Sequence, residues 1–472
     1  MVFSSNIFLF FFLPLFLAVY YLTPFKHKSF VILIGSFIFY CWWRVDFLAL
    51  FFGITLINHL VALRIVANEG GIRARQWMIF GVVCNLLALA LFKYFNFGVD
   101  TLNAALEGMG FRPMEFMHIV LPIGISFHAF QSISFLIDVY RKDAPPARSF
   151  MDFAAYNSLF PQMIAGPVLR YKDLADQFES RPHTLDQFSY GAYRFMLGFA
   201  KKVLIADTVA MLADSVYALP NPTMADAWIG ALAYTVQLYF DFTGYSDMAI
   251  GIAAMMGFKF LENFDHPYIS RSITEFWRRW HMSLSAWLKD YLYIPLGGNR
   301  KGKVRNYINL FLTMLLGGFW HGANFTFVIW GAWHGAWLAI EKAMGRKVDD
   351  APMPVFKRIG LVLGTFFIVM LGWVMFRAPT VSKAFDIYEG MFGFNGFGIS
   401  DAMAWQLPGM AVSALILGLG MVFVIPYYEA RKGIKIREMS GFLPHMMAIV
   451  LFILAVMKLS YQSYSPFLYF QF

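Results

Sequence analysis

The sequence contains few charged side chains. Only 14% of its 472 residues are Asp, Glu, Lys or Arg, whereas 59% are hydrophobic and the mean hydropathy is +0.57. A soluble domain carries about 25% charged residues, and a chain this apolar has too little polar surface to face water. The composition therefore excludes an ordinary soluble protein and predicts an all-α polytopic membrane protein. Aromatic residues, 19% of the chain, suit lipid-facing and interfacial positions.

Cysteine is also scarce, because Cys41 and Cys84 are the only two and both lie in apolar runs. Neither a disulfide scaffold nor a cysteine-based metal site is expected. The sequence lacks a Walker loop, an HExxH motif, a GxSxG elbow and a GxGxxG fingerprint in strand context, which leaves ATPase, metalloprotease and serine hydrolase functions unsupported. The net charge of +9 is explained by loops that we assign to the cytoplasm. We therefore expect no metal, no permanently bound cofactor and no nucleic-acid partner.

Long apolar segments make up most of the chain. A helix needs about 20 apolar residues to cross a bilayer, and about eleven segments approach that length. The predicted spans are residues 6–22, 30–43, 47–63, 77–97, 119–139, 228–256, 307–320, 325–340, 359–376, 410–427 and 443–460. The first span has no basic region before it and no small-residue cleavage site after it, so a retained helix is expected rather than a removed signal peptide.

The loops between these spans alternate in charge, which predicts the orientation of the chain. Basic loops stay in the cytoplasm. They contain Lys26 and Lys28, then Arg64, Arg73 and Arg75, then Arg141, Lys142 and Arg148, and later Arg431, Lys432, Lys435 and Arg437. The acidic segment 98–118 is expected in the periplasm, and the alternation places the N-terminus and the C-terminus there too. We predict a multi-pass protein of a bacterial inner membrane.

Residues 151–305 fit this alternation poorly. Pro161, Gly166 and Pro167 interrupt the apolar stretch 153–169, and backbone groups freed by such breaks must be satisfied inside protein or beside water, so a re-entrant segment is expected. Residues 273–293 alternate large apolar and charged side chains at helical spacing, which predicts an amphipathic helix along the cytoplasmic surface. No internal repeat supports an inverted-repeat transporter.

Polar side chains inside the apolar segments are costly and are therefore functional candidates. They are His128, Asp138, Asp207, Gln237, Asp241, Asp247, His281, His321, Asn324 and His334. His321 is flanked by glycines at a predicted helix break, where an imidazole could take up and return a proton near neutral pH. A buried histidine bonded to a carbonyl explains His321 about equally well.

Structural roles are the favoured interpretation of the other candidates near His321. His334 lies among tryptophans and small residues spaced as in helix packing. His281 falls on the polar face of the amphipathic segment, where solvation explains it. Asp241 and Asp247 are six residues apart and face different sides of a regular helix, so paired-carboxylate chemistry is unsupported unless Gly244 bends the helix.

A basic cluster lies between residues 271 and 305, where eight Lys or Arg face only Glu275 and Asp290. Such a cluster could hold the phosphates of coenzyme A. It could equally bind anionic lipid or only fix the topology.

Four motifs together resemble the membrane-bound O-acyltransferases. They are QLYFDFTGYSDMAIG at 237–251, SITEFWRRWHMSL at 272–284, YIPLGGNRK at 293–301 and GGFWHGAN at 317–324. The resemblance covers most of the chain, is densest at 237–342 and is loosest at 345–445. It implies one domain over residues 1–472, in which a ring of about eleven tilted transmembrane helices, with re-entrant and interfacial helices, surrounds a thinned centre.

The resemblance also implies a site and a reaction. His321 would be catalytic and His281 a second, supporting catalytic residue, which overrides the solvated-face interpretation of His281. The residues expected to bind the donor or line the pocket are Arg278, Arg279, Trp280, Trp320 and Asn324. The similarity is to the alginate-acetylating branch, which implies acetyl-CoA as the cytoplasmic donor and outward transfer of the acetyl group. The implied partners are the periplasmic polysaccharide O-acetylation proteins of the alginate system, together with membrane lipid. His321 would act as a general base or carry an acetyl group itself.

Other functions stay open at the level of sequence. The same reaction could modify cellulose, another exopolysaccharide or a D-alanylated cell-wall polymer. From another class, a membrane transporter could use the buried histidines as a proton relay.

Overall fold

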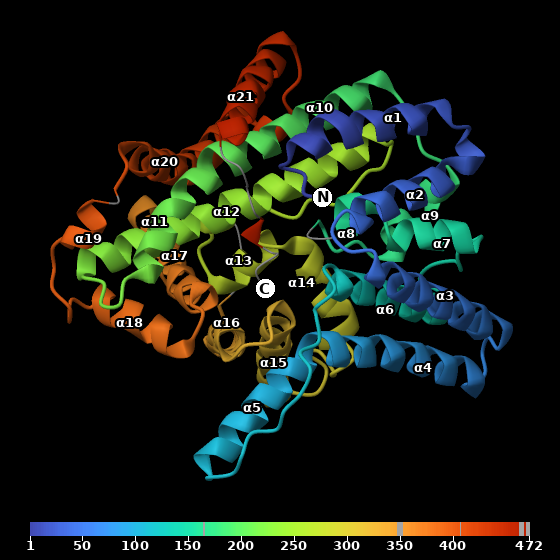
Figure 1. The fold of residues 1–472 in the computed structure, drawn as a ribbon, viewed down its shortest axis with the longest axis horizontal. Coiled ribbons are helices and arrows are strands. Elements are labelled where there is room, and N and C mark those ends of the chain that lie inside the picture. The colour runs from blue at the N-terminus through green and yellow to red at the C-terminus, as the bar shows by residue number, and fades with distance from the viewer. Residues whose placement is uncertain (164–165, 347–352, 406, 462–466, 469–472) are drawn as a thin grey trace. The chain divides into compact units, whose positions relative to one another are not determined.

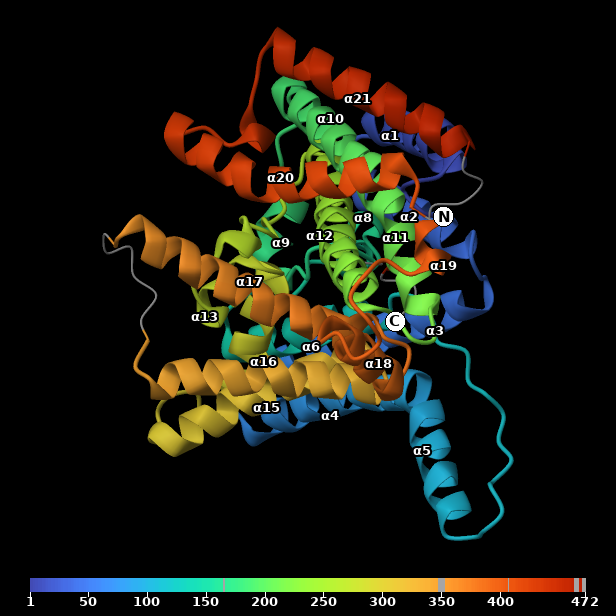
Figure 2. The ribbon, with the colours of Figure 1, turned by 90° about the vertical axis from the view of Figure 1, so that its left-hand side faces the viewer.

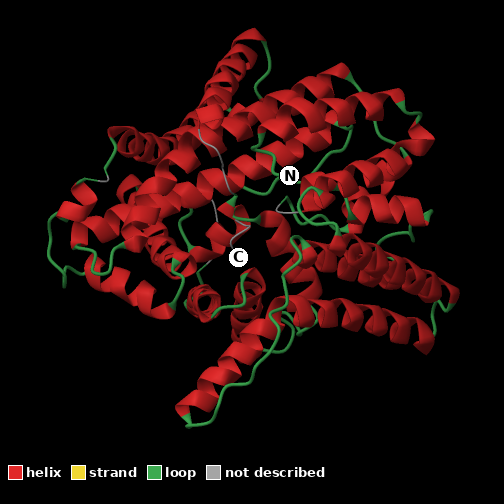
Figure 3. Cartoon of the chain, viewed as in Figure 1, coloured by secondary structure: helices red, strands yellow, loops and turns green. Residues whose placement is uncertain are grey.

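The computed structural model describes residues 1–163, 166–346, 353–405, 407–461 and 467–468. Over these ranges the chain consists of helices joined by turns and loops, with no strand (Figures 1 and 3). Contacts within the chain divide it into two compact units, Met1–Gly191 with Ile252–Leu261, and Ala192–Gly251 with Glu262–Phe472. The all-α prediction is confirmed, and the two units are described in turn.

The first unit is built around three long helices that pack against one another, α3 (Asp46–Ala67), α4 (Ile72–Leu89) and α6 (Ile125–Arg141). Its other segments are η1 (Phe8–Phe12), α1 (Leu13–Leu22), η2 (Phe25–His27), α2 (Lys28–Cys41), η3 (Ala90–Tyr94), α5 (Phe95–Gly108), α7 (Phe150–Asn157), α8 (Phe160–Met163), α9 (Tyr171–Glu179) and the start of α10 (Leu185–Ala200). The break predicted in residues 153–169 is present, because α7, α8 and α9 are separate; residues 164 and 165 lie outside the described ranges.

The second unit carries the remaining helices. They are η4 (Lys201–Ala206), α11 (Asp207–Ala218), α12 (Met224–Met255), η5 (Pro267–Ile269), α13 (Ile273–Arg279), α14 (Met282–Leu288), η6 (Lys289–Tyr293), α15 (Lys303–His321), α16 (Phe325–Ala343), α17 (Val355–Arg377), α18 (Val381–Met391), α19 (Asp401–Ala404), α20 (Gly409–Lys432), η7 (Ile436–Glu438) and α21 (Phe442–Tyr461). α15 and α16 form a tight hairpin, and α16 also packs on α17 (Figure 2).

Two glycines of α16 allow the close approach of this hairpin. A Cβ added at Gly331 would lie 2.5 Å from the carbonyl oxygen of Met314, and one added at Gly335 would lie 2.9 Å from that of Phe311. Because these neighbours are backbone atoms of α15, they cannot move aside cheaply. The helix-packing role predicted for the small residues around His334 is thus confirmed.

No membrane span is predicted from the sequence within residues 185–218. The structure has α10, η4 and α11 running on from one another, and the part of α10 in the second unit packs on α12, where a Cβ at Gly198 would lie 2.5 Å from the carbonyl oxygen of Gly244 (Figure 1). Lys201 and Lys202 lower the mean hydropathy of this stretch. Their charges are neutralised by Asp247 and Asp241 of α12, which are far away in sequence.

Helices are present at all eleven predicted spans, but their lengths differ. Among the described residues, five helical stretches are long and apolar enough to cross a membrane: Asp46–Ala67, Ile72–Gly108, Val355–Arg377, Gly409–Lys432 and Phe442–Tyr461. The predicted loop 98–118 was partly wrong, since α5 continues to Gly108, and the predicted span 119–139 becomes helical only at Ile125. Such a chain is a multi-pass membrane protein, whose remaining helices are shorter or more polar than a simple span requires.

Candidate active site

His321 is the last residue of α15 and is 7% exposed. Gly322 follows in an extended conformation, with φ −155° and ψ 146°, and α16 begins three residues later at Phe325. The helix break predicted from the flanking glycines is therefore present. It places an imidazole at the end of a helix, inside the second unit.

A small cavity opens beside this imidazole. Its walls are formed by Leu238, Asp241, Phe242, Trp280, His321, Trp330, Trp373, Phe376, Phe467 and Leu468. The ring of Trp330 stands perpendicular to that of His321, at 88° with centroids 5.2 Å apart, and the ring of Phe376 lies 5.5 Å away. Walls of this kind exclude water, which strengthens electrostatic interactions with a reacting group.

His281 faces the same region from another element. Its ring centroid lies 6.5 Å from that of His321, and the residue is completely buried. Its backbone has φ +46° and ψ 53°, a left-handed conformation that a non-glycine residue rarely adopts. The extended backbone of Trp280 ends α13 and the left-handed His281 precedes α14, so the single amphipathic helix predicted for residues 273–293 was wrong. The break turns His281 away from the polar face on which helical spacing had placed it.

The other predicted pocket residues fall into two groups. Trp280 lines the cavity, whereas Trp320, which is 4% exposed directly before His321, is not among the described residues of the cavity wall. Asn324 instead caps α16: its side chain accepts a hydrogen bond from the backbone N–H of Thr326 and donates one to the carbonyl oxygen of Pro379. Asn324 is therefore placed where it supports the fold of the His321 turn rather than the cavity wall.

The two predicted arginines of α13 differ from each other. Arg278 is exposed. Arg279 is paired with Glu275 at 3.1 Å and with Asp265 at 3.6 Å. Burial raises the pKa of Glu275, but the hydrogen bonds and charges of Arg271 and Arg279 outweigh it and hold the pKa below its usual value. Glu275 is thus an anion that engages Arg279, and Arg278 has the freer guanidinium.

Asp241 connects the cavity to a buried ion pair. One carboxylate oxygen lies 2.6 Å from the ammonium of Lys202, and the other accepts a hydrogen bond from the backbone N–H of Leu468. Asp247 lies on another side of α12, where it pairs with Arg194 and Lys201. The two carboxylates lie on different sides of the helix, which confirms the prediction from their spacing.

His334 packs behind the site. It is fully buried, accepts a hydrogen bond from the indole N–H of Trp277 at 3.3 Å, and stacks with Phe276 at a centroid distance of 6.2 Å. Across the described ranges, no three His, Cys, Asp or Glu side chains come together in a way that could hold a metal ion. Sequence reasoning missed Lys202, which pairs with Asp241, and Asn263, whose Oδ1 lies 3.1 Å from Nδ1 of His281, because a hydropathy profile shows no partner that is distant in sequence.

The sequence model of the membrane-bound O-acyltransferase family matches residues 141–377, which include both histidines. The chain belongs to this family. The class of protein is therefore a membrane-bound acyltransferase, an enzyme, and the transporter interpretation is set aside.

Individual relatives within the family resemble the chain over most or all of its length. A protein named "probable alginate O-acetylase AlgI" in Pseudomonas putida is 54% identical over 491 residues, and another of that name in Azotobacter vinelandii is 52% identical over 506, each alignment covering both chains fully. A peptidoglycan O-acetyltransferase of Helicobacter pylori is 36% identical over 84% of this chain and 80% of its own. Similarity over the full length of the alginate-named relatives extends through α20 and α21, beyond the segment matched by the family model.

Proposed function

We propose that this enzyme takes acetyl from acetyl-CoA on the cytoplasmic side of the bacterial inner membrane and passes it outward, where periplasmic proteins of the alginate system attach it to alginate. The full-length similarity to proteins named alginate O-acetylases supports the acceptor. The alternation of loop charge supports the orientation, with the N-terminus and the C-terminus in the periplasm. The observation that carries the chemistry is the imidazole of His321 in the wall of an aromatic-walled cavity, with the buried ring of His281 6.5 Å from it.

In the proposed reaction His321 is the general base. Its neutral imidazole removes the proton from the acceptor hydroxyl as the oxygen attacks the thioester carbonyl carbon. A C–O bond forms, the C–S bond breaks, and the coenzyme A sulfur leaves with the proton that the imidazole returns. His281 orients the donor or acceptor. An acetyl-histidine intermediate would divide the same exchange into two transfers through His321.

The acceptor is tested by analysing the polymer. Cells that lack the chain should make alginate without O-acetyl groups, and expression of the chain should restore the acetyl signal in nuclear magnetic resonance spectra of the purified polymer. Acetate released by mild base from cellulose, peptidoglycan and other exopolysaccharides provides the comparison. Loss of acetate from one of those polymers with alginate unchanged would contradict the alginate proposal while leaving the acyltransferase class intact.

Arg278 is proposed to contact the phosphates of the donor, because it carries an exposed guanidinium of the basic cluster and precedes His281 by three residues. Replacing Arg278 by Ala should raise the KM for acetyl-CoA about 3- to 10-fold, the loss of one partly solvated charge-assisted contact, with kcat nearly unchanged. Initial rates of coenzyme A release from inside-out membrane vesicles measure both constants.

The matched variant is Arg279→Ala, which removes one of the partners of Glu275 and of Asp265. Its effect should appear as reduced thermal stability of the purified protein rather than as a selective rise in KM. An unchanged KM for Arg278→Ala would contradict the proposed phosphate contact.

A further inference from the structure

The segment 262–266 lies along the turn between α13 and α14 and holds it by backbone hydrogen bonds. The backbone N–H of Met282 donates to the carbonyl oxygen of Asn263 at 2.9 Å, and the backbone N–H of Asp265 donates to the carbonyl oxygen of Arg279, also at 2.9 Å. These two bonds flank His281 on both sides in sequence. The left-handed backbone of His281 is therefore held from outside its own helices, as strain at a functional position requires.

The side chain of Asn263 reaches the imidazole directly. Its Oδ1 lies 3.1 Å from Nδ1 of His281, 2.8 Å from the hydroxyl of Ser283 and 3.3 Å from the backbone N–H of Ser283. Its Nδ2 donates to the hydroxyl of Ser246 at 3.3 Å. A backbone N–H can only donate, so the Asn263 atom that faces Ser283 and His281 must be the oxygen.

This orientation selects one tautomer of His281. A carbonyl-type oxygen accepts from Nδ1 only if Nδ1 carries the proton, which leaves Nε2 as an acceptor. Nε2 is buried and has no hydrogen-bond partner among the described residues. The ring is in contact with Phe242, Phe264 and His321. His321 is the one titratable group among these contacts, and none of them brings a charged side chain to the ring.

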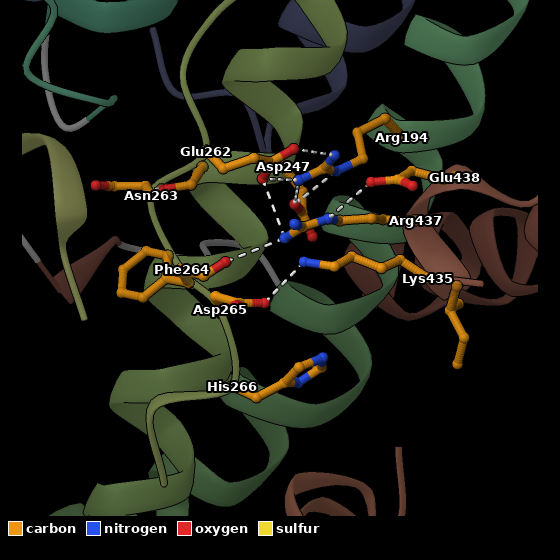
Figure 4. Close-up of polar contacts among 12 residues, drawn as sticks. Arg194, Asp247, Glu262, Asn263, Phe264, Asp265, His266, Lys435, Arg437 and Glu438 are labelled. Carbon is orange, nitrogen blue, oxygen red and sulfur yellow. Dashed lines mark hydrogen bonds and ion pairs between the residues drawn. The ribbon is translucent and has the colours of Figure 1, made fainter. Parts of the chain in front are cut away.

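Charged residues on both sides of Asn263 anchor the segment (Figure 4). Glu262 receives a bidentate pair from Arg194, at 2.9 and 2.8 Å, and also pairs with Arg437. Arg437 donates to the carbonyl oxygen of Phe264, and Lys435 lies 2.9 Å from Asp265. Burial raises the pKa of Asp265, but Lys435 and the neighbouring cations outweigh it and hold the pKa below its usual value. Asn263 is thus fixed between two anchored anions.

We propose that Asn263 is a positioning residue for the acyl transfer: its Oδ1 fixes His281 as the Nδ1–H tautomer and leaves Nε2 of this ring, whose centroid lies 6.5 Å from that of His321, able to accept a hydrogen bond from the acceptor hydroxyl or another donor group of the substrate. The proposal rests on the proposed function, because it assumes that His281 takes part in acetyl transfer.

Two substitutions separate this role from a general contribution to folding. Asn263→Ala removes the acceptor and frees the ring to change tautomer, so kcat should fall about 10- to 100-fold, as when other supporting hydrogen bonds to a functional histidine are removed. Asn263→Asp keeps an acceptor oxygen in place but adds a negative charge beside Nδ1. The carboxylate favours the protonated ring, so activity should be lost on the acidic side at a higher pH than in the wild type and should recover well above the Ala variant at alkaline pH.

The experiment measures coenzyme A release and polymer acetylation from pH 5.5 to 9.5, a range of about 4 units around the unperturbed value of histidine, with rates normalised to folded enzyme in full-length, membrane-embedded protein. Asn309→Ala is the matched control, because Asn309 is also fully buried and donates to the carbonyl oxygen of Gly298 away from the cavity. Its pH profile should equal that of the wild type. A wild-type profile for Asn263→Asp, an unchanged kcat for Asn263→Ala, or equal loss in both variants at every pH would overturn the role of Asn263. A wild-type enzyme that releases no coenzyme A would instead contradict the proposed function.

Discussion

Replacement of His321 by Ala is expected to reduce acetyl transfer by at least about 100-fold, because a positioned general base contributes about 10²- to 10⁴-fold to such a reaction. The imidazole is enclosed by the rings of Trp330 and Phe376, and bulk water has little access to replace it. Glutamine, which keeps polarity and much of the volume, should be equally inactive since it cannot take up a proton. The measurement is the acetyl content of the polymer made in cells with equal membrane levels of each variant.

The control for this experiment is His27→Ala, which removes an exposed histidine of η2 and should leave acetylation unchanged. A second comparison, His334→Phe, removes a buried imidazole that packs behind the site. It should lower stability more than activity per folded molecule. Normal polymer acetylation by His321→Ala would contradict both the general-base and the acetyl-histidine routes.

The position of His321 could be predicted from local sequence, whereas that of His281 could not. Flanking glycines signal a helix break, and the break alone places His321 between α15 and α16. For residues 273–293 the periodicity is helical throughout, and nothing in it marks the break formed by the extended Trp280 and the left-handed His281. That conformation is stabilised by Asn263 and Asp265, which reach the turn through tertiary contacts. The motif resemblance selects His281 as a candidate because it does not depend on periodicity.

Residues 185–218, which form α10, η4 and α11, show the same limit for prediction from hydropathy. Their hydropathy is lowered by Lys201, Lys202 and Asp207, so a window based on apolar residues passes over them. In the folded chain these charges find partners on α12 or within the same stretch of chain. A hydropathy profile counts each charge as unpaired, and it fails wherever pairing between helices supplies the counterion. Composition was sufficient to predict the class of helical membrane proteins, because that prediction does not depend on knowing which charges pair between helices.

Lys202 provides the second test with a large expected effect. Its ammonium, on a side chain only 3% exposed, lies 2.6 Å from a carboxylate oxygen of Asp207 and 2.6 Å from one of Asp241. Lys202→Met preserves most of the volume but leaves two carboxylates without their shared cation. Breaking a buried ion pair by removing one partner costs about 3–5 kcal/mol. The unfolding temperature of the detergent-purified protein and its yield in the membrane should both fall.

A second substitution shows whether the uncompensated charge is the cause. Asp241→Asn in the Lys202→Met background removes one stranded carboxylate, keeps an acceptor for the backbone N–H of Leu468, and should recover part of the lost stability. Lys342→Met, at an exposed position of α16, is the control. It should change the free energy of unfolding by no more than a surface substitution does, about 0.5 kcal/mol. Because Asp241 also lines the cavity beside His321, the double variant should regain stability without regaining full activity. Equal stability of Lys202→Met and the wild type would contradict this prediction. It would show that the ion pairs of Lys202 with Asp207 and Asp241 do not stabilise the fold.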